Sequence, residues 1–325
     1  MIWILYVLLG LIAIYLGFIF YVSNQLYRLA LSRKFVVDMN RQNIVSTEQV
    51  DLLEWFYSGK EIFQALPYEN WEMTKDNLNL KAVYLAADAS RPPTEFSGLV
   101  AVLVHGWRDT KEARMRRGLQ YHEAGFDVLI PDLRSHGESE GTQIDMGCAH
   151  RDDIIDWLQV LRERMSERGL AQPRGFILDG LSMGSATVLT LSGDKLPDDV
   201  LAIVADCGYS SMWEQGSWLV RKMPAVLRYP VLWLCFLQAR SFTGVNFFKE
   251  TAYEQVQKAK IPLFIIHGTG DSFVPYHMGK KLFAACSSSR KEFWPVEGAE
   301  HGVSACMHPE EYNRRCLDFI RSVLE

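Results

Sequence analysis

Three residues of the sequence have the types that nucleophilic catalysis needs: a serine, an aspartate and a histidine. The serine, Ser182, lies in Gly180-Leu-Ser-Met-Gly184, directly after the apolar run Phe176–Leu178 and before a segment of helical character. A strand, a Gly-x-Ser-x-Gly turn and a helix in this order form a nucleophile elbow, in which glycines let the strand and the helix approach closely. The motif is short and also occurs as an ordinary turn, so the other residues of the chain must decide between the two interpretations.

The acid and the base follow the serine in the chain. Asp271 comes directly after an apolar strand, and His301 lies in the loop before the last helix. Imidazole can take the serine proton and return it to a leaving group, and a carboxylate fixes the imidazole tautomer and stabilises the imidazolium. Asp206, after the strand that follows the elbow, is the alternative acid, but the sequence favours Asp271. His136 precedes the serine and is expected to organise a loop.

An oxyanion formed at the serine needs two N–H donors. The backbone N–H groups of Met183, which follows the serine, and of Trp107, which follows the strand end at His105-Gly106, are the predicted pair. Alternatively, the Trp107 side chain covers the substrate pocket. His105 and His267 are expected to hold loop backbones by hydrogen bonds.

The elements around these residues alternate between strands and helices. Strands are predicted at residues 99–104, 126–130, 176–178, 201–204, 263–266 and 292–294, and helices at 110–124, 151–168 and 309–324. This alternation predicts a mostly parallel sheet with helices on both faces, whose sites form at the carboxyl ends of the strands. A hairpin is predicted at residues 71–87 around Asp76-Asn77, and a helix is predicted to start at Ser46.

A segment of about residues 207–258 interrupts the alternation and is rich in aromatic side chains. Pro224 and Pro230 are expected to break it into short helices. We interpret it as a helical cap over the active site. Trp107, Trp213, Trp218 and Phe273 are the predicted residues of the substrate pocket. The alternative is that the aromatic side chains form only the cap's own core.

The N-terminus differs from the rest of the chain, since Ile2–Val22 contains no charged side chain. About twenty such residues can cross a bilayer, so residues 1–25 are predicted to be a single membrane anchor. A secretory signal peptide is the alternative, but no basic residue precedes the apolar run. Arg28, Arg33, Lys34 and Arg41 follow it, which predicts a cytoplasmic catalytic domain. Ser23–Asn43 is interpreted as a polar connector. Residues 26–70 are predicted to be a linker with an N-terminal helix, and residues 71–325 the α/β-hydrolase domain with its cap.

Composition excludes several other functions. The 325 residues carry a net charge of −5, which gives no electrostatic basis for binding nucleic acid. The six cysteines show no Cys-x-x-Cys spacing and are expected to be buried free thiols, which favours a reducing compartment. No metal site or cofactor is predicted, because metal-ligand spacing and phosphate-binding glycine motifs are lacking.

From about Trp71 to the end, the chain resembles the α/β-hydrolase superfamily, and within it the lysophospholipase and serine-aminopeptidase-like bacterial hydrolases. The stretches that match are His105-Gly-Trp107, Asp132-Leu-Arg-Ser-His-Gly137, Gly180-Leu-Ser-Met-Gly-Ser185, His267-Gly-Thr-Gly-Asp271 with Val274-Pro275, and Gly298-Ala-Glu-His301. The resemblance implies hydrolysis of a carboxylic ester through an acyl-serine. The nucleophile is not the Asp of the dehalogenase branch, and the His-Gly-Gly-Gly motif of another lipase branch is lacking.

The sequence therefore predicts an α/β-hydrolase fold with a helical cap and one N-terminal transmembrane helix. The leading hypothesis is a membrane-anchored serine hydrolase acting on an acyl ester, either a small molecule or a lipid such as a lysolipid. Cleavage of an amide or peptide, or acyl transfer, would use the same triad. A non-catalytic binding module is the third hypothesis.

Overall fold

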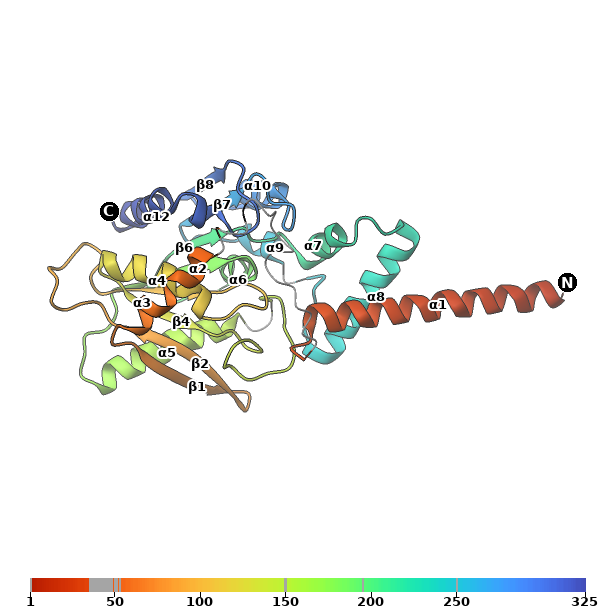
Figure 1. The fold of residues 1–325 in the computed structure, drawn as a ribbon, viewed down its shortest axis with the longest axis horizontal. Helices are drawn as coiled ribbons and strands as arrows, with labels where there is room; N and C mark the ends of the chain where they lie inside the picture. The colour runs from red at the N-terminus through yellow and green to blue at the C-terminus, as the bar shows by residue number, and fades with distance from the viewer. Residues whose placement is uncertain are drawn as a thin grey trace.

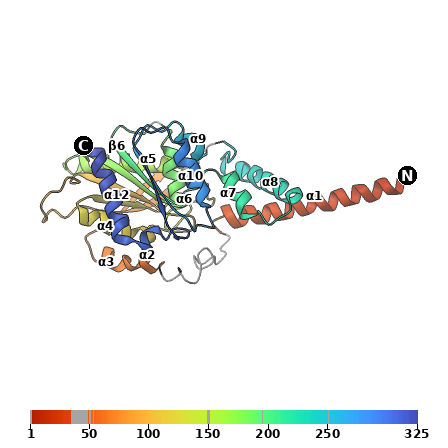
Figure 2. The same cartoon turned by 90° about the horizontal axis from the view of Figure 1, so that it is seen from above.

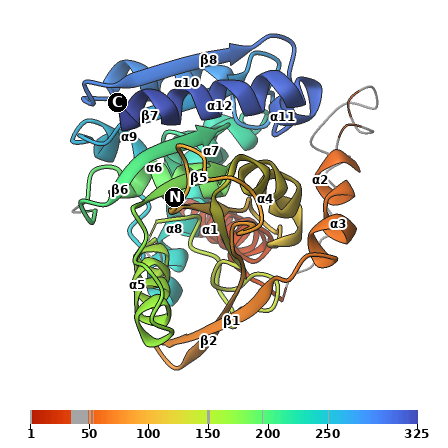
Figure 3. The same ribbon diagram turned by 90° about the vertical axis from the view of Figure 1, so that its left-hand side faces the viewer.

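A single mixed sheet forms the centre of the computed structural model, which describes residues 2–34, 49, 52, 54–148, 151–194, 196–249 and 251–325. Its eight described strands lie in the order β1-β2-β4-β3-β5-β6-β7-β8. The strands are β1 Glu69–Lys75, β2 Leu78–Leu85, β3 Leu99–Val104, β4 Asp127–Pro131, β5 Gly175–Leu181, β6 Val200–Asp206, β7 Leu263–Gly268 and β8 Lys291–Val296. Figure 3 shows β1 and β2 at one edge of the sheet and β8 at the other.

Strands β4 to β8 pair in parallel with β3 or with one another, whereas β2 is antiparallel to both β1 and β4. The turn between β1 and β2 is the hairpin predicted at Asp76-Asn77, and both residues have positive φ angles, 53° and 59°. Such angles are typical of two-residue hairpin turns, in which Asn and Asp are favoured. The predicted fold class, an α/β-hydrolase fold with a mostly parallel sheet, is confirmed.

Helices cover both faces of this sheet. The described helices as a whole are α1 Ile2–Leu31, α2 Glu54–Ser58, α3 Lys60–Gln64, α4 Glu112–Ala124, α5 Asp152–Glu167, α6 Met183–Leu191, α7 Met212–Leu219, α8 Ala225–Thr243, α9 Ala252–Val256, α10 Tyr276–Ala285, α11 Ser304–Met307 and α12 Pro309–Leu324, of which α1, α7 and α8 lie beyond the sheet. Helices α4 and α12 pack on one face, and α5, α6 and α10 on the other (Figure 2), so each face has its own hydrophobic core. The predicted helix start at Ser46 lies outside the described residues.

All six cysteines lie in these cores or in the cap as buried free thiols. This confirms the prediction made from their spacing. Burial raises the pKa of several of them, for example that of Cys316 to about 12. These thiols therefore stay protonated at neutral pH and behave as small apolar side chains.

Helix α1 is longer than the sequence predicts, because it continues to Leu31 and includes much of the segment read as a connector. Its buried residues Ile19, Ser23, Tyr27 and Leu31 recur every four positions and therefore lie on one face, against α8. Most of its preceding residues are apolar and exposed, and α1 is long and apolar enough to cross a membrane. Figure 1 shows α1 projecting from the rest of the protein, with α7 and α8 beside it.

The cap differs from the prediction at Pro230. Pro224 precedes α8 as expected, but Pro230 lies inside that helix and does not end it. A proline at this position cannot donate a hydrogen bond to the carbonyl four residues earlier, that of Val226. The Tyr15 hydroxyl of α1 donates to this oxygen at 2.6 Å. Helix α1 thus satisfies the carbonyl that the proline leaves without its helical partner.

This arrangement predicts a coupling between α1 and α8. Tyr15→Phe removes the donor to Val226, and we expect it to weaken the start of α8 by about 1 kcal/mol. The measurement is amide hydrogen exchange of α8, which should be about fivefold faster in the variant. In a Pro230→Ala background, where α8 supplies its own donor, the Tyr15 substitution should have little effect. An equal effect in both backgrounds would contradict the coupling.

Candidate active site

The backbone at Ser182 is strained and fits its place only because two glycines flank it. Ser182 has φ 55° and ψ −113°, an uncommon conformation for a residue with a side chain. A Cβ on Gly184 would lie 2.2 Å from the Val104 carbonyl oxygen, and one on Gly180 would lie 2.3 Å from the Gly184 carbonyl oxygen. The close approach of β5, α6 and β3 therefore requires glycine at both positions.

The structure brings Ser182, His301 and Asp271 together in a chain of hydrogen bonds. Ser182 Oγ lies 2.8 Å from His301 Nε2, and His301 Nδ1 lies 2.7 Å from Asp271 Oδ2. The other carboxylate oxygen of Asp271 accepts hydrogen bonds from the N–H groups of Phe273 and Val274, at 3.0 and 2.8 Å. These two donors fix the carboxylate in the orientation that meets the imidazole.

The alternative acid, Asp206, does not contact the imidazole through any hydrogen bond found among the described residues. Its carboxyl accepts from the Tyr312 hydroxyl at 3.1 Å and from Ser304 Oγ at 3.5 Å. Complete burial raises the pKa of Asp206 to about 7. Its backbone carbonyl accepts from the Ser182 N–H at 2.9 Å, so Asp206 supports the strained turn. The structure therefore places Asp271, which the sequence favours, beside His301.

The three other histidines near the strand ends hold loop backbones. His105 Nε2 accepts from the Leu133 N–H at 2.9 Å, which joins the loops after β3 and β4. His267 Nε2 lies 2.9 Å from the Val274 carbonyl oxygen and so steadies the loop of the aspartate. His136 Nδ1 lies 3.0 Å from the carbonyl oxygen of Arg134, and burial lowers the pKa of His136 to about 3. These contacts match the roles that the sequence suggests.

Both residues predicted to supply oxyanion donors lie next to the serine. Met183 is the first residue of α6, and the first N–H groups of a helix have no acceptor within the helix. Trp107 follows Gly106, where an added Cβ would lie 3.5 Å from Ser182 Cβ. The loop after β3 therefore runs directly beside the serine. Donation to an oxyanion by these two groups remains a prediction.

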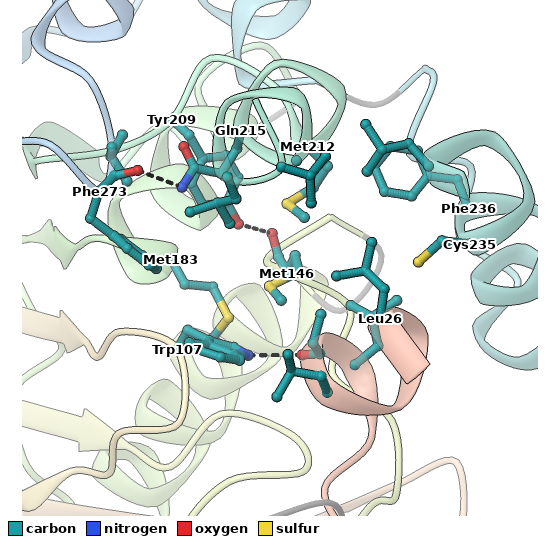
Figure 4. A pocket seen from close by; sticks show the side chains of 18 of the residues that line it. Leu26, Trp107, Met146, Met183, Tyr209, Met212, Gln215, Cys235, Phe236 and Phe273 are labelled. Atoms are coloured by element: carbon teal, nitrogen blue, oxygen red, sulfur yellow. Dashed lines mark hydrogen bonds between the residues drawn. The ribbon is translucent and has the colours of Figure 1, made fainter. Parts of the chain in front are cut away.

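A cavity of about 280 Å³ lies between the sheet, the cap and α1, and Ser182 is one of the residues that line it. Figure 4 shows Trp107, Leu26 and Phe236 around this cavity. None of the described side chains that line it carries a charge. Tyr209 donates its hydroxyl to the Met146 carbonyl at 2.6 Å, and Gln215 Nε2 donates to the Phe273 carbonyl at 2.9 Å. Gln215 Oε1 is buried without a hydrogen-bond partner among the described residues. The cavity wall is thus apolar with one unused acceptor.

The structure brings two of the four residues predicted for the substrate pocket to this cavity. Trp107 and Phe273 line the cavity, but Trp213 and Trp218 do not. The reason is the phase of α7: Met212, Gln215, Gly216 and Leu219 recur at helical spacing and face the cavity, so the two tryptophans lie on other faces. Trp213 lines a separate cavity of the cap, and Trp218 Nε1 donates to the Ser272 carbonyl at 2.8 Å.

The end of α1 is the part of the cavity that the sequence did not predict. Leu26, Leu29, Ala30 and Leu31 line it. Two side chains after β3 hold this helix end by its carbonyl groups: Trp107 Nε1 donates to Ala30 at 2.9 Å, and Arg108 donates to Leu29 at 2.8 Å. Such carbonyls need partners outside their helix. The available signal was the apolar spacing, which continues past Ser23 without a glycine or proline.

The Cys207 thiol lies near the same histidine and aspartate, within 4.8 Å of their ligand atoms. One thiol, one imidazole and one carboxylate could in principle hold a metal ion. A thiol must lose its proton to bind a metal, however, and burial raises the pKa of Cys207 well above its usual value. The imidazole also already bonds to both the Asp271 carboxylate and Ser182 Oγ, so the geometry favours a proton-transfer site.

Comparison with known proteins places this architecture in a family. Residues 101–315 match the family model described as the alpha/beta hydrolase family. The chain belongs to this family. The fold agrees, since the Pyrococcus furiosus esterase Pf2001 superposes with a TM-score of 0.62 at 20% identity, over 87% of this chain and 98% of the esterase.

Two relatives of this alpha/beta hydrolase have similar sequences over part of their length. The Bacillus subtilis protein YqkD is 26% identical over 61% of this chain and 63% of its own. The lysophosphatidylserine lipase ABHD12 of Danio rerio is 25% identical over 59% of this chain and 48% of its own. The chain therefore matches about half to two thirds of the length of these relatives.

The raised pKa of Asp206 predicts a pH-dependent stability. An unfolded aspartate has a pKa of about 3.9, so between about pH 4 and 7 the folded state retains a proton that the unfolded state has released. The free energy of unfolding should therefore fall as the pH rises through this range. Asp206→Asn keeps an oxygen for Tyr312 and removes the titration.

The measurement is denaturant unfolding of both proteins in detergent at a series of pH values. The stability of the wild type relative to Asp206→Asn should fall by roughly a few kcal/mol between about pH 4 and 7 and then level off. A difference that does not change with pH would contradict the assignment.

Proposed function

We propose that this alpha/beta hydrolase is a membrane-anchored serine hydrolase that cleaves a carboxylic ester through an acyl-serine. The observation that carries the proposal is the hydrogen-bonded chain of Ser182, His301 and Asp271, which ends on a serine exposed to an apolar cavity. In the proposed roles the serine is the nucleophile, the histidine the base and the aspartate its orienting partner.

The reaction proceeds in two halves. His301 Nε2 takes the proton from Ser182 Oγ as the oxygen bonds to the ester carbonyl carbon, and the Met183 and Trp107 N–H groups stabilise the oxyanion. The carbon–oxygen bond to the alcohol then breaks, and the imidazolium gives its proton to the leaving oxygen. Water, deprotonated by the same imidazole, attacks the acyl-serine; the bond from the acyl carbon to Ser182 Oγ breaks, the acid is released, and the imidazolium returns its proton to Oγ. Asp271 stabilises the imidazolium in both halves.

The cavity is best suited to hold the acyl chain of the substrate. Its described walls carry no charge, as suits an alkyl chain, whereas a peptide would need partners for its amide groups. Gln215 Oε1 offers one acceptor to a substrate hydroxyl. Two similar proteins, one named an esterase and the other a lysophosphatidylserine lipase, support the same class. We therefore favour a lipid or lysolipid ester over an amide.

The anchor is proposed to be retained. A signal peptidase that removed α1 would also remove Leu26, Leu29 and Leu31 from the cavity wall. The basic residues Arg28, Arg33 and Lys34 follow the apolar part of α1, which supports a cytoplasmic catalytic domain.

Labelling with a fluorophosphonate tests the nucleophile. On membranes from expressing cells, the wild type should react and Ser182→Ala should not, because only a serine beside a base attacks the phosphorus atom. Ser185→Ala is the matched control: it changes a serine in the first turn of the same helix that is buried and has no hydrogen-bond partner among the described residues. It should label like the wild type. Labelling of Ser182→Ala would overturn the assignment.

Product analysis then separates ester hydrolysis from the other reactions of an acyl-enzyme. We expect the enzyme to release free fatty acid from a lysophospholipid. When competing alcohols or amines are added, we expect none of them to become acylated. Acylation of the added acceptor would instead identify an acyltransferase. Cleavage of peptide or aryl-amide substrates at higher kcat/KM than esters would identify an amidase.

Two aspartates give a matched test of the acid. Asp271→Asn leaves the imidazole without its charged partner and should lower kcat for an ester by about 10⁴-fold. Asp206→Asn changes an equally buried carboxyl at the end of the neighbouring strand and should lower kcat by less than about tenfold. If Asp206→Asn causes the larger loss, the roles of the two residues are reversed.

A further inference from the structure

Exposed apolar side chains outside α1 are concentrated on the cap. Six large apolar side chains among the described residues are exposed on or next to α7 and α8: Leu219, Val226, Tyr229, Trp233, Phe242 and Phe248. In the rest of the described chain outside α1, the exposed large apolar side chains are Tyr57, Ile62 and Leu170. Val226 and Phe242 are about two thirds exposed, at 65% and 66%. A concentration of this kind marks an interaction surface.

The position of this surface along α1 is set by the hydrogen bond from Tyr15 to Val226. The large apolar residues of α1 before Tyr15 are exposed, as expected of a helix that contacts lipid. Exposed apolar residues of α1 continue beyond this level, to Phe18, Phe20 and Tyr21. If these residues are covered by lipid, the start of α8 lies beside them at the same depth.

Charge on the cap suits the headgroups of a bilayer. The turn between α7 and α8 carries Arg221 and Lys222, and Arg228 follows on α8; all are basic in a chain whose net charge is −5. Arg221 lies over the Trp218 ring at 3.8 Å, and Arg228 lies over the Tyr229 ring at 4.7 Å. Basic side chains stacked on aromatic rings suit an interface where apolar and polar surroundings meet.

We propose that the α7–α8 hairpin, residues 212–243, is a second membrane contact that enters the headgroup region and upper acyl chains of an anionic leaflet. Val226, Tyr229 and Trp233 contact the acyl chains, and Arg221, Lys222 and Arg228 pair with lipid phosphates. The hairpin tip lies on the same side of the protein as the free part of α1 (Figure 1). The proposal depends on α1 being a membrane anchor and does not depend on the reaction.

The contact would bring the cavity to the leaflet. Leu219 and Val220 at the end of α7, Leu232 of α8 and Leu26 of α1 belong to its wall, so the three elements that meet the lipid also bound the cavity. An acyl chain could then pass from the leaflet to Ser182 without crossing water. This favours a substrate that resides in the membrane over one dissolved in the cytoplasm.

The depth of the hairpin is measurable on the full-length protein in vesicles of phosphatidylcholine and phosphatidylglycerol. Val226→Cys, labelled with a fluorophore that reports polarity, should show blue-shifted emission and be quenched by lipids with a nitroxide near the top of the acyl chain. Leu170→Cys, also an exposed apolar position but on the catalytic domain, is the matched control. The native cysteines are buried, and unsubstituted protein gives their background. If position 226 behaves like position 170, the proposal is wrong.

A charge test addresses the anionic leaflet. Arg221→Gln/Lys222→Gln should lower hydrolysis of a lysolipid in phosphatidylglycerol-containing vesicles by about five- to tenfold and leave pure phosphatidylcholine vesicles nearly unaffected. Lys258→Gln/Lys260→Gln removes the same charge from the segment before β7 and should change neither. Equal losses in both pairs would exclude a specific anionic contact.

Hydrolysis of a short, water-soluble ester distinguishes this proposal from the proposed function. Arg221→Gln/Lys222→Gln should retain wild-type activity on that ester, because neither side chain lines the cavity. An inactive wild type would refute the proposed reaction, while the fluorophore at position 226 would still report whether the hairpin enters the leaflet.

Discussion

The whole site depends on one strained residue, Ser182, whose backbone is held where few side-chain-bearing residues can be. Such strain costs about 1–3 kcal/mol and persists only when the surroundings determine the conformation several times over. Here Gly184 packs on the carbonyl of Val104, and Asp206 accepts the serine N–H. A buried ion pair network fixes the preceding strand, because Asp179 binds Arg114, Arg117 and Tyr121 of α4. The tightly packed centre thus keeps the hydroxyl at the strand ends.

Parallel pairing explains why distant residues meet there. The serine follows β5, the aspartate follows β7 and the histidine follows β8, so their loops leave the same edge of the sheet. Each loop is then fixed locally: His267 holds the aspartate loop, and two backbone N–H groups hold the carboxylate itself. The catalytic geometry therefore comes from the order of the strands and is refined by short-range hydrogen bonds.

The sequence was informative where a local pattern determines the structure. Gly180-x-Ser182-x-Gly184, the strand ends and the hairpin at Asp76-Asn77 all act within a few residues, and the structure has each of them. The sequence was misleading where the residue that determines the local structure lies far away in the chain. Pro230 lies inside a helix, and the Val226 carbonyl that it leaves without a helical donor accepts from the Tyr15 hydroxyl instead. Tyr15 and Val226 are 211 positions apart in the sequence. The prediction that Trp213 and Trp218 line the pocket rests on the aromatic composition of the segment. Composition does not say which face of α7 is turned toward the cavity.

The continuity of α1 has a practical consequence for anyone who wants a water-soluble form of this protein. Deleting the apolar residues would leave only the last few turns, and so short a helix is not stable by itself. Leu26 and Leu29, on the cavity wall, would lose the support that Ile19 and Ser23 provide against α8. A fragment without these residues would therefore have an altered cavity, and a substrate preference measured on it would not represent that of the native protein. Helix α1 is part of the cavity wall, so the cavity has to be studied with this helix in place.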